Sequence, residues 1–149
     1  MLSRDTSSLL IASKPEFVPS PLRCLAMLLA IVVSLRIRGF ASTLRTASTI
    51  VAKVSRPPSE GAAAERQLVE RTMNNVVLAA ALLPFKARCL EQSLAIFVFL
   101  RRRGVPVELR IGVQPYRFRA HAWVEYAGVP VNESADYLTG FVPLPSLPL

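Results

Sequence analysis

One cysteine and one histidine are the residues of this sequence best suited to nucleophilic chemistry. Cys89 stands at the predicted start of a helix, shortly after Lys86 and directly after Arg88. Backbone N–H groups at a helix N-terminus and nearby cations stabilise the thiolate, the nucleophilic form of cysteine. His121 is the sole histidine, so any imidazole base must be this residue. Each alone is more typical of an ordinary packing residue, but together they predict cysteine chemistry with a histidine base.

A histidine base is oriented when a third group accepts a hydrogen bond from its other ring nitrogen. Glu133 and Asp136 lie beyond the turn that follows the histidine segment, and an antiparallel return would bring them alongside His121. Glu125 shares a face with His121 but precedes that turn, so we expect it to point away. From the residues alone, either Glu133 or Asp136 could be the carboxylate that orients the histidine. The ordinary alternative is that both are solvated carboxylates at the end of a strand.

Cys24 is the second cysteine, and it lies in a predicted packing helix. Two cysteines make no disulfide framework, which favours a reducing, cytoplasmic setting. A closed structural zinc site needs four ligands of the cysteine and histidine type, and the three scattered residues of these types cannot supply them. We therefore expect neither a metal nor a cofactor.

Composition and charge limit the classes of protein that this chain can belong to. Its 149 residues are 52% hydrophobic and 19% charged, which suits one globular domain with one core. The formal net charge is +8, and the stretch between Glu16 and Glu60 contains six cations and no acid. Such a charge favours anionic partners. Interleaved aromatic residues are missing from this stretch, so we do not expect nucleic acid among them.

The most apolar run covers residues 25–35, about half of the roughly 20 apolar residues that span a bilayer. Mostly polar residues precede the run, unlike the start of a signal peptide. A buried helix is the first interpretation. The alternative is a helix that lies on a membrane surface, as a peripheral contact, or against a partner protein.

The N-terminal half is predicted to be helical. Residues 1–21 contain three prolines and no periodicity, which indicates a flexible lead-in. Residues 22–54 form either one long helix or two that break near Gly39. A second helix begins after residue 59, with apolar residues at steps of three and four. A third runs from about residue 87 to 103.

After Gly104, which ends the third helix, the apolar residues alternate with a period of two. Strands are predicted at 107–113, 118–126 and 129–132, joined as an antiparallel meander. The proline-rich tail is predicted to be irregular. Helices followed by an antiparallel sheet define the α+β class.

Several phrases of the sequence, in this order, resemble the transglutaminase-like domain of lasso-peptide maturation proteins. They are Cys89-Leu90-x-x-Ser93-Leu94-Ala95, Leu100-Arg101-Arg102-Arg103-Gly104, Ile111-Gly112-Val113, Phe118-x-Ala120-His121-Ala122-Trp123-Val124-Glu125-x-x-Gly128, Val131-Asn132-Glu133 and Asp136. The resemblance is close over residues 84–144 and loose before them. It implies a flexible lead-in at 1–21, a helical region at 22–83 that packs on the core and contacts partners, and a papain-like catalytic core at 84–149.

The resemblance also implies an activity, namely removal of the leader from a ribosomally made lasso-peptide precursor through a thioester. Cys89 would be the nucleophile and His121 the general base and acid. The family places an aspartate after the asparagine of the next strand, and this chain has Glu133 there, one methylene longer. We prefer Glu133 as the third member and keep Asp136 as the fallback.

The partners implied are the precursor's leader, a separate small leader-recognition protein and an ATP-dependent lasso cyclase. The chain shows neither a fused recognition domain nor a phosphate-binding Gly-rich loop, which fits the split version of these systems. Three alternatives stay open. They are an amide-exchanging acyltransferase of the same fold, a non-catalytic peptide-binding module, and a basic membrane-associating helical protein.

Overall fold

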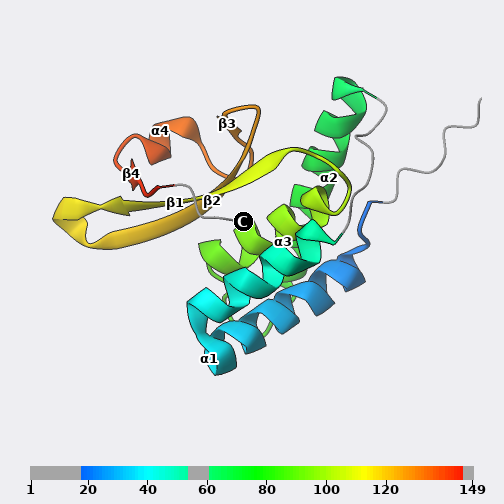
Figure 1. The fold of residues 1–149 in the computed structure, drawn as a ribbon, viewed down its shortest axis with the longest axis horizontal. Coiled ribbons are helices and arrows are strands. Elements are labelled where there is room, and N and C mark those ends of the chain that lie inside the picture. The colour runs from blue at the N-terminus through cyan, green and yellow to red at the C-terminus, as the bar shows by residue number, and fades with distance from the viewer. Residues whose placement is uncertain (1–17, 54–60, 146–149) are drawn as a thin grey trace, which may run out of the picture.

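The computed structural model describes residues 18–53 and 61–145 as three long helices against a small antiparallel sheet (Figure 1). The elements follow in the order α1 Pro21–Ala52, α2 Ala62–Ala81, α3 Cys89–Arg101, β1 Val107–Gln114, η1 Pro115–Arg117, β2 Arg119–Tyr126, β3 Val129–Pro130, α4 Ala135–Leu138 and β4 Val142–Pro143. The predicted α+β class is confirmed. The lead-in up to residue 17, and the predicted helix start at residue 59, lie outside the described residues.

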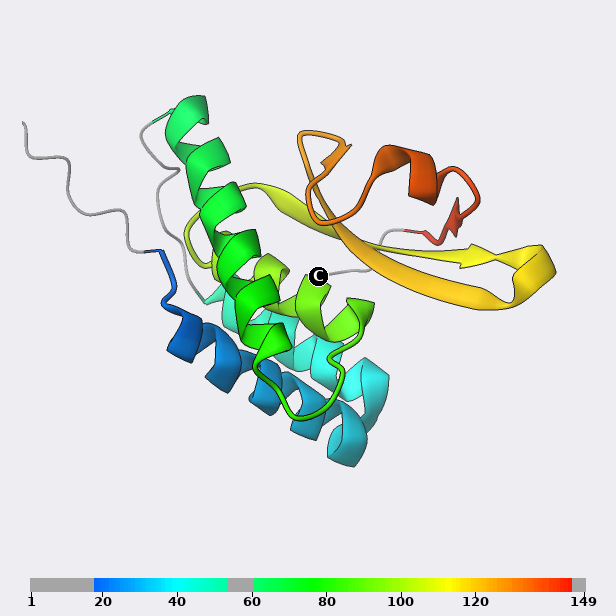
Figure 2. The ribbon, with the colours of Figure 1, turned by 180° about the vertical axis from the view of Figure 1, so that it is seen from behind.

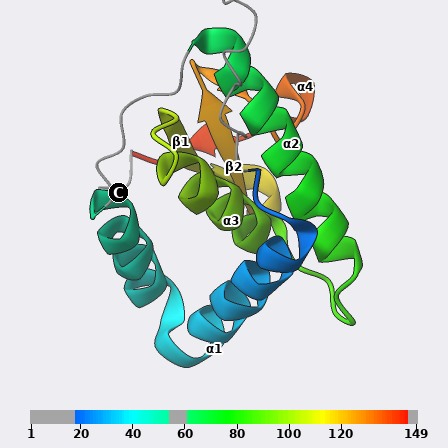
Figure 3. The same ribbon diagram turned by 90° about the vertical axis from the view of Figure 1, so that its right-hand side faces the viewer.

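Helix α1 consists of two arms that meet at a sharp bend (Figure 3). Gly39 adopts φ 76° and ψ 175° inside the helix, a conformation that costs little only for glycine. Of the two predicted alternatives, the structure therefore shows the broken helix. Ser20 caps the first arm by accepting a hydrogen bond from the Arg23 N–H at 3.4 Å, and Pro21 supplies the favoured first residue.

The first arm of α1 is only partly buried, although a buried helix was the first interpretation. Of the described helices, α1 is the one long and apolar enough to cross a membrane, judged by length and composition. Only 22% of its most apolar stretch is buried inside the molecule. One face packs into the core through Cys24, Leu28 and Ile31, while the opposite face of the same arm remains exposed.

Helix α3 is the centre of the core. All six residues from 93 to 98 are buried, because α1 and α2 cover one side of the helix and the sheet covers another (Figures 1 and 2). Leu94, Ile96 and Leu100 join residues of α1, α2, β1 and β2 in one apolar cluster. Tyr126, at the end of β2, donates a 2.6 Å hydrogen bond to the buried Glu65 of α2. Burial of the apolar cluster around Leu94, Ile96 and Leu100 holds α3 against the sheet.

The sheet has the strand order β3-β2-β1-β4, and its pairs are antiparallel. The register places Gly112 of β1 opposite His121 of β2. The third strand is shorter than predicted, at residues 129–130. The proline-rich tail was predicted to be irregular, and this was wrong at Val142–Pro143, which form β4 and add to the free edge of β1. Helix α4 lies before that tail, in a stretch where no element was predicted. An edge strand tolerates Pro143, because one side of it needs no ladder hydrogen bond.

Candidate active site

The single histidine is hydrogen-bonded to a carboxylate. His121 lies on β2, and its Nε2 is 3.0 Å from Oε2 of Glu133, which follows β3. A carboxylate only accepts hydrogen bonds, so this contact favours the tautomer of the neutral ring that has the proton on Nε2 and the lone pair on Nδ1. Glu133 Oε1 accepts from the Ser134 backbone N–H at 3.1 Å. This tautomer of His121 leaves Nδ1 able to accept a proton.

Of Glu133 and Asp136, the two carboxylates that could orient His121, the structure places only Glu133 against the ring. Asp136 lies in the first turn of α4, where its backbone carbonyl accepts from the Thr139 hydroxyl at 2.8 Å. Among the described residues, no hydrogen bond joins the Asp136 carboxylate to His121. Glu125 is held elsewhere, because its two oxygens accept from Arg110 at 3.0 Å and from Trp123 at 2.9 Å. Glu133 is thus the carboxylate that meets the imidazole.

Three aromatic side chains enclose the imidazole of His121. Trp123 stacks with it at a centroid distance of 6.3 Å, Tyr137 approaches edge-on at 5.3 Å, and Phe141 lies tilted at 5.5 Å. The His121 side chain is consequently only 14% exposed. Low solvent access strengthens the electrostatic contact with Glu133. Sequence reasoning missed Tyr137 and Phe141, because both lie between the third predicted strand and the proline-rich tail, where no local pattern predicted an element.

Cys89 is the first residue of α3, and its side chain is partly exposed. Two side chains form hydrogen bonds with the backbone just before this helix. Glu91 accepts from the Arg88 N–H at 3.0 Å, and Gln92 donates to the Ala87 carbonyl at 2.9 Å. The first N–H groups of a helix have no partner within it, so they are available to an anion beside the thiol.

One buried hydrogen bond ties α3 to the histidine strand. Ser93, one helical turn after Cys89, is fully buried, and its Oγ donates to the Ala122 carbonyl at 2.9 Å. Ala122 is the neighbour of His121, so this bond draws the start of α3 toward the histidine. No hydrogen bond joins Cys89 to His121 in the part of the chain that the structure describes. Such contacts often tighten only when substrate is bound.

Asn132 extends the same link to the carboxylate. Its Nδ2 donates to Ser93 Oγ at 2.9 Å, and its Oδ1 accepts from the Val124 N–H at 2.7 Å. The residue before Glu133 is therefore pinned to both α3 and β2. Sequence reasoning quoted Ser93 and Asn132 without a role for either. A serine inside an apolar helix was the available signal, because a buried hydroxyl requires partners.

Cys24 provides a contrast with Cys89. It is fully buried in α1, and burial raises the pKa of its thiol to about 11. Since the folded pKa is raised, the thiol stays protonated at neutral and mildly alkaline pH. We expect iodoacetamide at about pH 8 to label Cys89 alone in the native protein, and both cysteines after denaturation. Peptide mass mapping checks this, and native labelling of Cys24 at the rate of Cys89 would contradict it.

Gly112 leaves room for the Trp123 ring that stacks on His121. A Cβ at this position would lie 2.8 Å from Cη2 of Trp123 and 3.2 Å from Cβ of Phe141. We expect Gly112→Ala to displace the ring, to cost about 1–3 kcal/mol of stability and to slow any reaction that uses His121. Urea unfolding and an activity assay measure both effects.

Gly140→Ala is the control for Gly112→Ala. Its added methyl group would meet the side-chain end of Gln114, at 2.6 Å from Nε2 and 3.7 Å from Cδ, and this end of a flexible side chain can move aside. We therefore expect Gly140→Ala to behave nearly as the parent protein. Equal losses in the two variants would show that the contact with Trp123 is not the cause.

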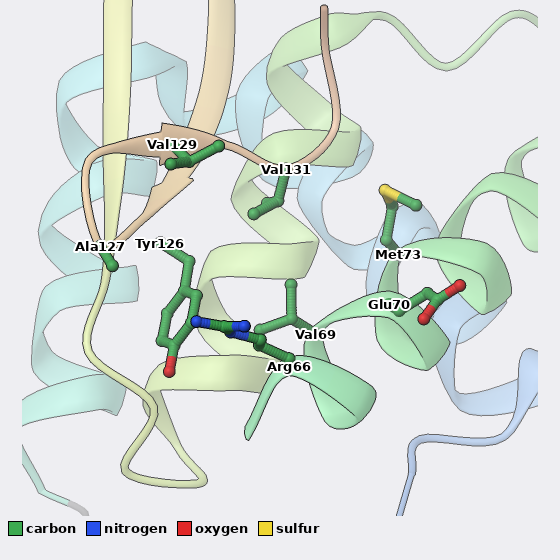
Figure 4. A pocket seen from close by; sticks show the side chains of 8 residues that line it. All are labelled: Arg66, Val69, Glu70, Met73, Tyr126, Ala127, Val129 and Val131. Carbon is green, nitrogen blue, oxygen red and sulfur yellow. The ribbon is translucent and has the colours of Figure 1, made fainter. Parts of the chain in front are cut away.

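A separate pocket lies between α2 and the end of the sheet (Figure 4). Its volume is about 390 Å³ and it is mostly apolar. It is lined by Arg66, Val69, Glu70, Met73, Tyr126, Ala127, Val129 and Val131. None of Cys89, His121 and Glu133 lines it, so it does not belong to the candidate site. Across residues 18–53 and 61–145, no group of three or more His, Cys, Asp or Glu could hold a metal ion.

A helix that begins with cysteine, packed on a sheet that carries a histidine and carboxylate pair, matches a known class of protein. The chain corresponds to the transglutaminase-like superfamily over residues 44–146, and it belongs to this superfamily. The match includes most of the second arm of α1, all of α2 and α3, and the sheet.

The chain is also similar to one individual protein. The microcin J25-processing protein McjB of Escherichia coli is 33% identical to this chain over 72 residues. The matched stretch is 48% of this chain and 35% of McjB, so the chain corresponds to about a third of that protein. The resemblance drawn from the sequence is thereby confirmed. No solved structure matches the chain.

Proposed function

We propose that this protein is a cysteine peptidase that removes the leader from a ribosomally synthesised lasso-peptide precursor. The observation that supports this most strongly is the hydrogen bond between His121 and Glu133. His121 lies on β2, and Ser93 joins β2 to α3, the helix that begins with Cys89. Membership of the transglutaminase-like superfamily and the similarity to McjB support the proposal.

In the first step, His121 Nδ1 takes the proton of the Cys89 thiol, and the sulfur attacks the carbonyl carbon at the leader–core junction. The oxyanion accepts hydrogen bonds from the free N–H groups at the start of α3. The C–N bond then breaks while Nδ1 returns its proton to the departing amine. The products are a leader thioester and the free core peptide.

In the second step, water gives a proton to Nδ1 and its oxygen attacks the thioester carbonyl. The C–S bond breaks, the leader departs as a carboxylic acid, and Nδ1 returns its proton to the thiolate of Cys89. Glu133 stays ionised throughout. Its hydrogen bond to Nε2 stabilises the imidazolium that forms in both steps.

We place this reaction in the cytoplasm, within a system of several proteins. A separate small recognition protein would present the leader, and an ATP-dependent cyclase would close the ring on the released core. The test is to incubate the purified protein with a precursor and a recognition protein encoded beside it, and to follow the products by mass spectrometry. Release of leader and core by the parent chain but not by Cys89→Ala is the expected result. An intact precursor in every mixture would contradict the proposal.

The superfamily gives one rival, amide exchange, in which an amine instead of water captures the same thioester. Added hydroxylamine or a primary amine separates the two reactions. A peptidase should release mostly the free leader acid even when the amine is present, whereas an acyltransferase should release the leader amide. The mass of the leader decides between them.

A further inference from the structure

The first arm of α1 carries an exposed apolar stripe on the side away from the core. Leu22, Leu29, Val33 and Ile37 are 74%, 40%, 51% and 77% exposed. Together with the exposed Ala26 they recur at steps of three and four residues, so they share one face of the helix. We call this face the outer stripe. At 1.5 Å of rise per residue it is about 22 Å long.

The fold itself does not require the outer stripe to be apolar. The opposite face of the same arm already supplies the core through Cys24, Leu28 and Ile31. A helix that is apolar on all sides is typical of one covered on all sides, by protein or by lipid. A stripe of this length and exposure on one element indicates a surface that is covered in use.

A cation lies at the edge of the outer stripe, and the helix contains no acid. Arg36 lies two turns beyond Leu29 at that edge, and Arg38 follows at the end of the arm, turned away from the stripe; both are exposed. The exposed Arg45 lies on the second arm. Residues 18–53 contain no Asp or Glu at all. An apolar face bordered by arginines is the pattern of a helix that lies in the interface of an anionic bilayer.

The position of α1 suits such a surface. Figures 1 and 2 show α1 along the side of the molecule opposite the sheet. A bilayer that covered the outer stripe would therefore leave the sheet, with His121 and Glu133, directed away from the lipid. The stripe runs along the outside of a single helix, which a flat lipid surface can cover without a matching shape.

We propose that the outer stripe of α1 binds the surface of anionic phospholipid membranes, with the helix in the plane of the interface. The apolar side chains enter the headgroup boundary, and Arg36 at the edge of the stripe pairs with lipid phosphates. Arg38, at the end of the arm, reaches the same surface only through the length of its side chain. This binding goes beyond the proposed peptidase activity and does not depend on it. A protein partner on the same stripe is the competing occupant.

The experiment is flotation of the full chain with two kinds of vesicle. We expect it to float with a mixture of phosphatidylglycerol and phosphatidylcholine, and to stay at the bottom with phosphatidylcholine alone. Each cation near an anionic surface contributes about fivefold in partitioning, so Arg36→Glu with Arg38→Glu, which removes two cations, should weaken binding by more than about tenfold. High salt should weaken it likewise.

A pair of matched double variants tests the apolar part. Leu29→Glu with Val33→Glu should abolish flotation, whereas Val77→Glu with Leu78→Glu should leave it unchanged. The latter side chains are 51% and 50% exposed on α2, so the change in charge and exposure is comparable. Circular dichroism and urea unfolding confirm that each variant is folded, because all four positions are exposed.

Three results would overturn the proposal. The first is a parent chain that floats with neither kind of vesicle, and the second is equal flotation with both kinds. The third is an equal loss of flotation in the two double variants. If the parent does not float but Leu29→Glu with Val33→Glu loses a dimer or the recognition protein, the stripe is a protein interface. Leader cleavage in vesicle-free solution should be the same for all these variants, so failure of this proposal is distinct from failure of the peptidase.

Discussion

Cys89→Ala is expected to abolish leader cleavage, with no thioester and no released core, while the protein keeps its fold. The thiol is the only nucleophile at the start of α3, and alanine removes one atom from a partly exposed position, so the cavity cost is small. The loss should reach the background rate of the precursor, a factor of about 10⁶ for a nucleophile of this kind. Single-turnover cleavage followed by mass spectrometry measures it.

Cys24→Ala is the matched control for Cys89→Ala, because it removes the other thiol of the chain. Cys24 is buried and its thiol pKa is raised to about 11, so it contributes packing and no reactive thiolate. We expect some loss of stability and almost full cleavage. An active Cys89→Ala beside an inactive but folded Cys24→Ala would show that the nucleophile had been misassigned.

Glu133→Gln is expected to slow cleavage by about four orders of magnitude, as for loss of the carboxylate in a related triad. The amide is neutral, so it no longer stabilises the imidazolium of His121. It can also turn its NH₂ group toward Nε2 and favour the tautomer with the proton on Nδ1. That tautomer cannot accept the proton of Cys89. The measurement is again single-turnover cleavage of precursor, with folding checked by circular dichroism.

Asp136→Asn is the control for Glu133→Gln, since it makes the same change of charge three residues away. Asp136 lies in the first turn of α4, and we expect its replacement to cost about tenfold or less, through the loop that carries Tyr137. An Asp136→Asn variant that is silent beside an active Glu133→Gln would move the orienting role to Asp136. Cys89 and His121 would keep their roles.

The secondary structure around the site could be predicted from local signals. Alternating apolar residues predicted the paired strands of Ile111 and His121, and Gly104, at φ 81°, stands at the predicted end of the third helix. These signals depend on neighbours in sequence, which is why one chain suffices to read them. The pairing of a helix-start cysteine with a strand histidine likewise followed from residue types, and it stays a prediction.

The details of the site depended on contacts between residues far apart in the sequence. No local pattern states that Asn132 links Ser93 to β2, or that Phe141 returns to cover His121. Each contact joins separate elements, and its free energy exists only after α3, β1 and β2 have packed.

The sequence by itself therefore determined the class of fold and pointed to a cysteine and a histidine as the candidate reactive residues. The tertiary structure brings Glu133, and not Asp136, into hydrogen-bond contact with the His121 ring at 3.0 Å, because the chain after β3 passes alongside β2. It also decided which face of α1 is exposed. Apolar residues surround that helix on all sides, so its periodicity alone could not show which side meets the core and which remains open.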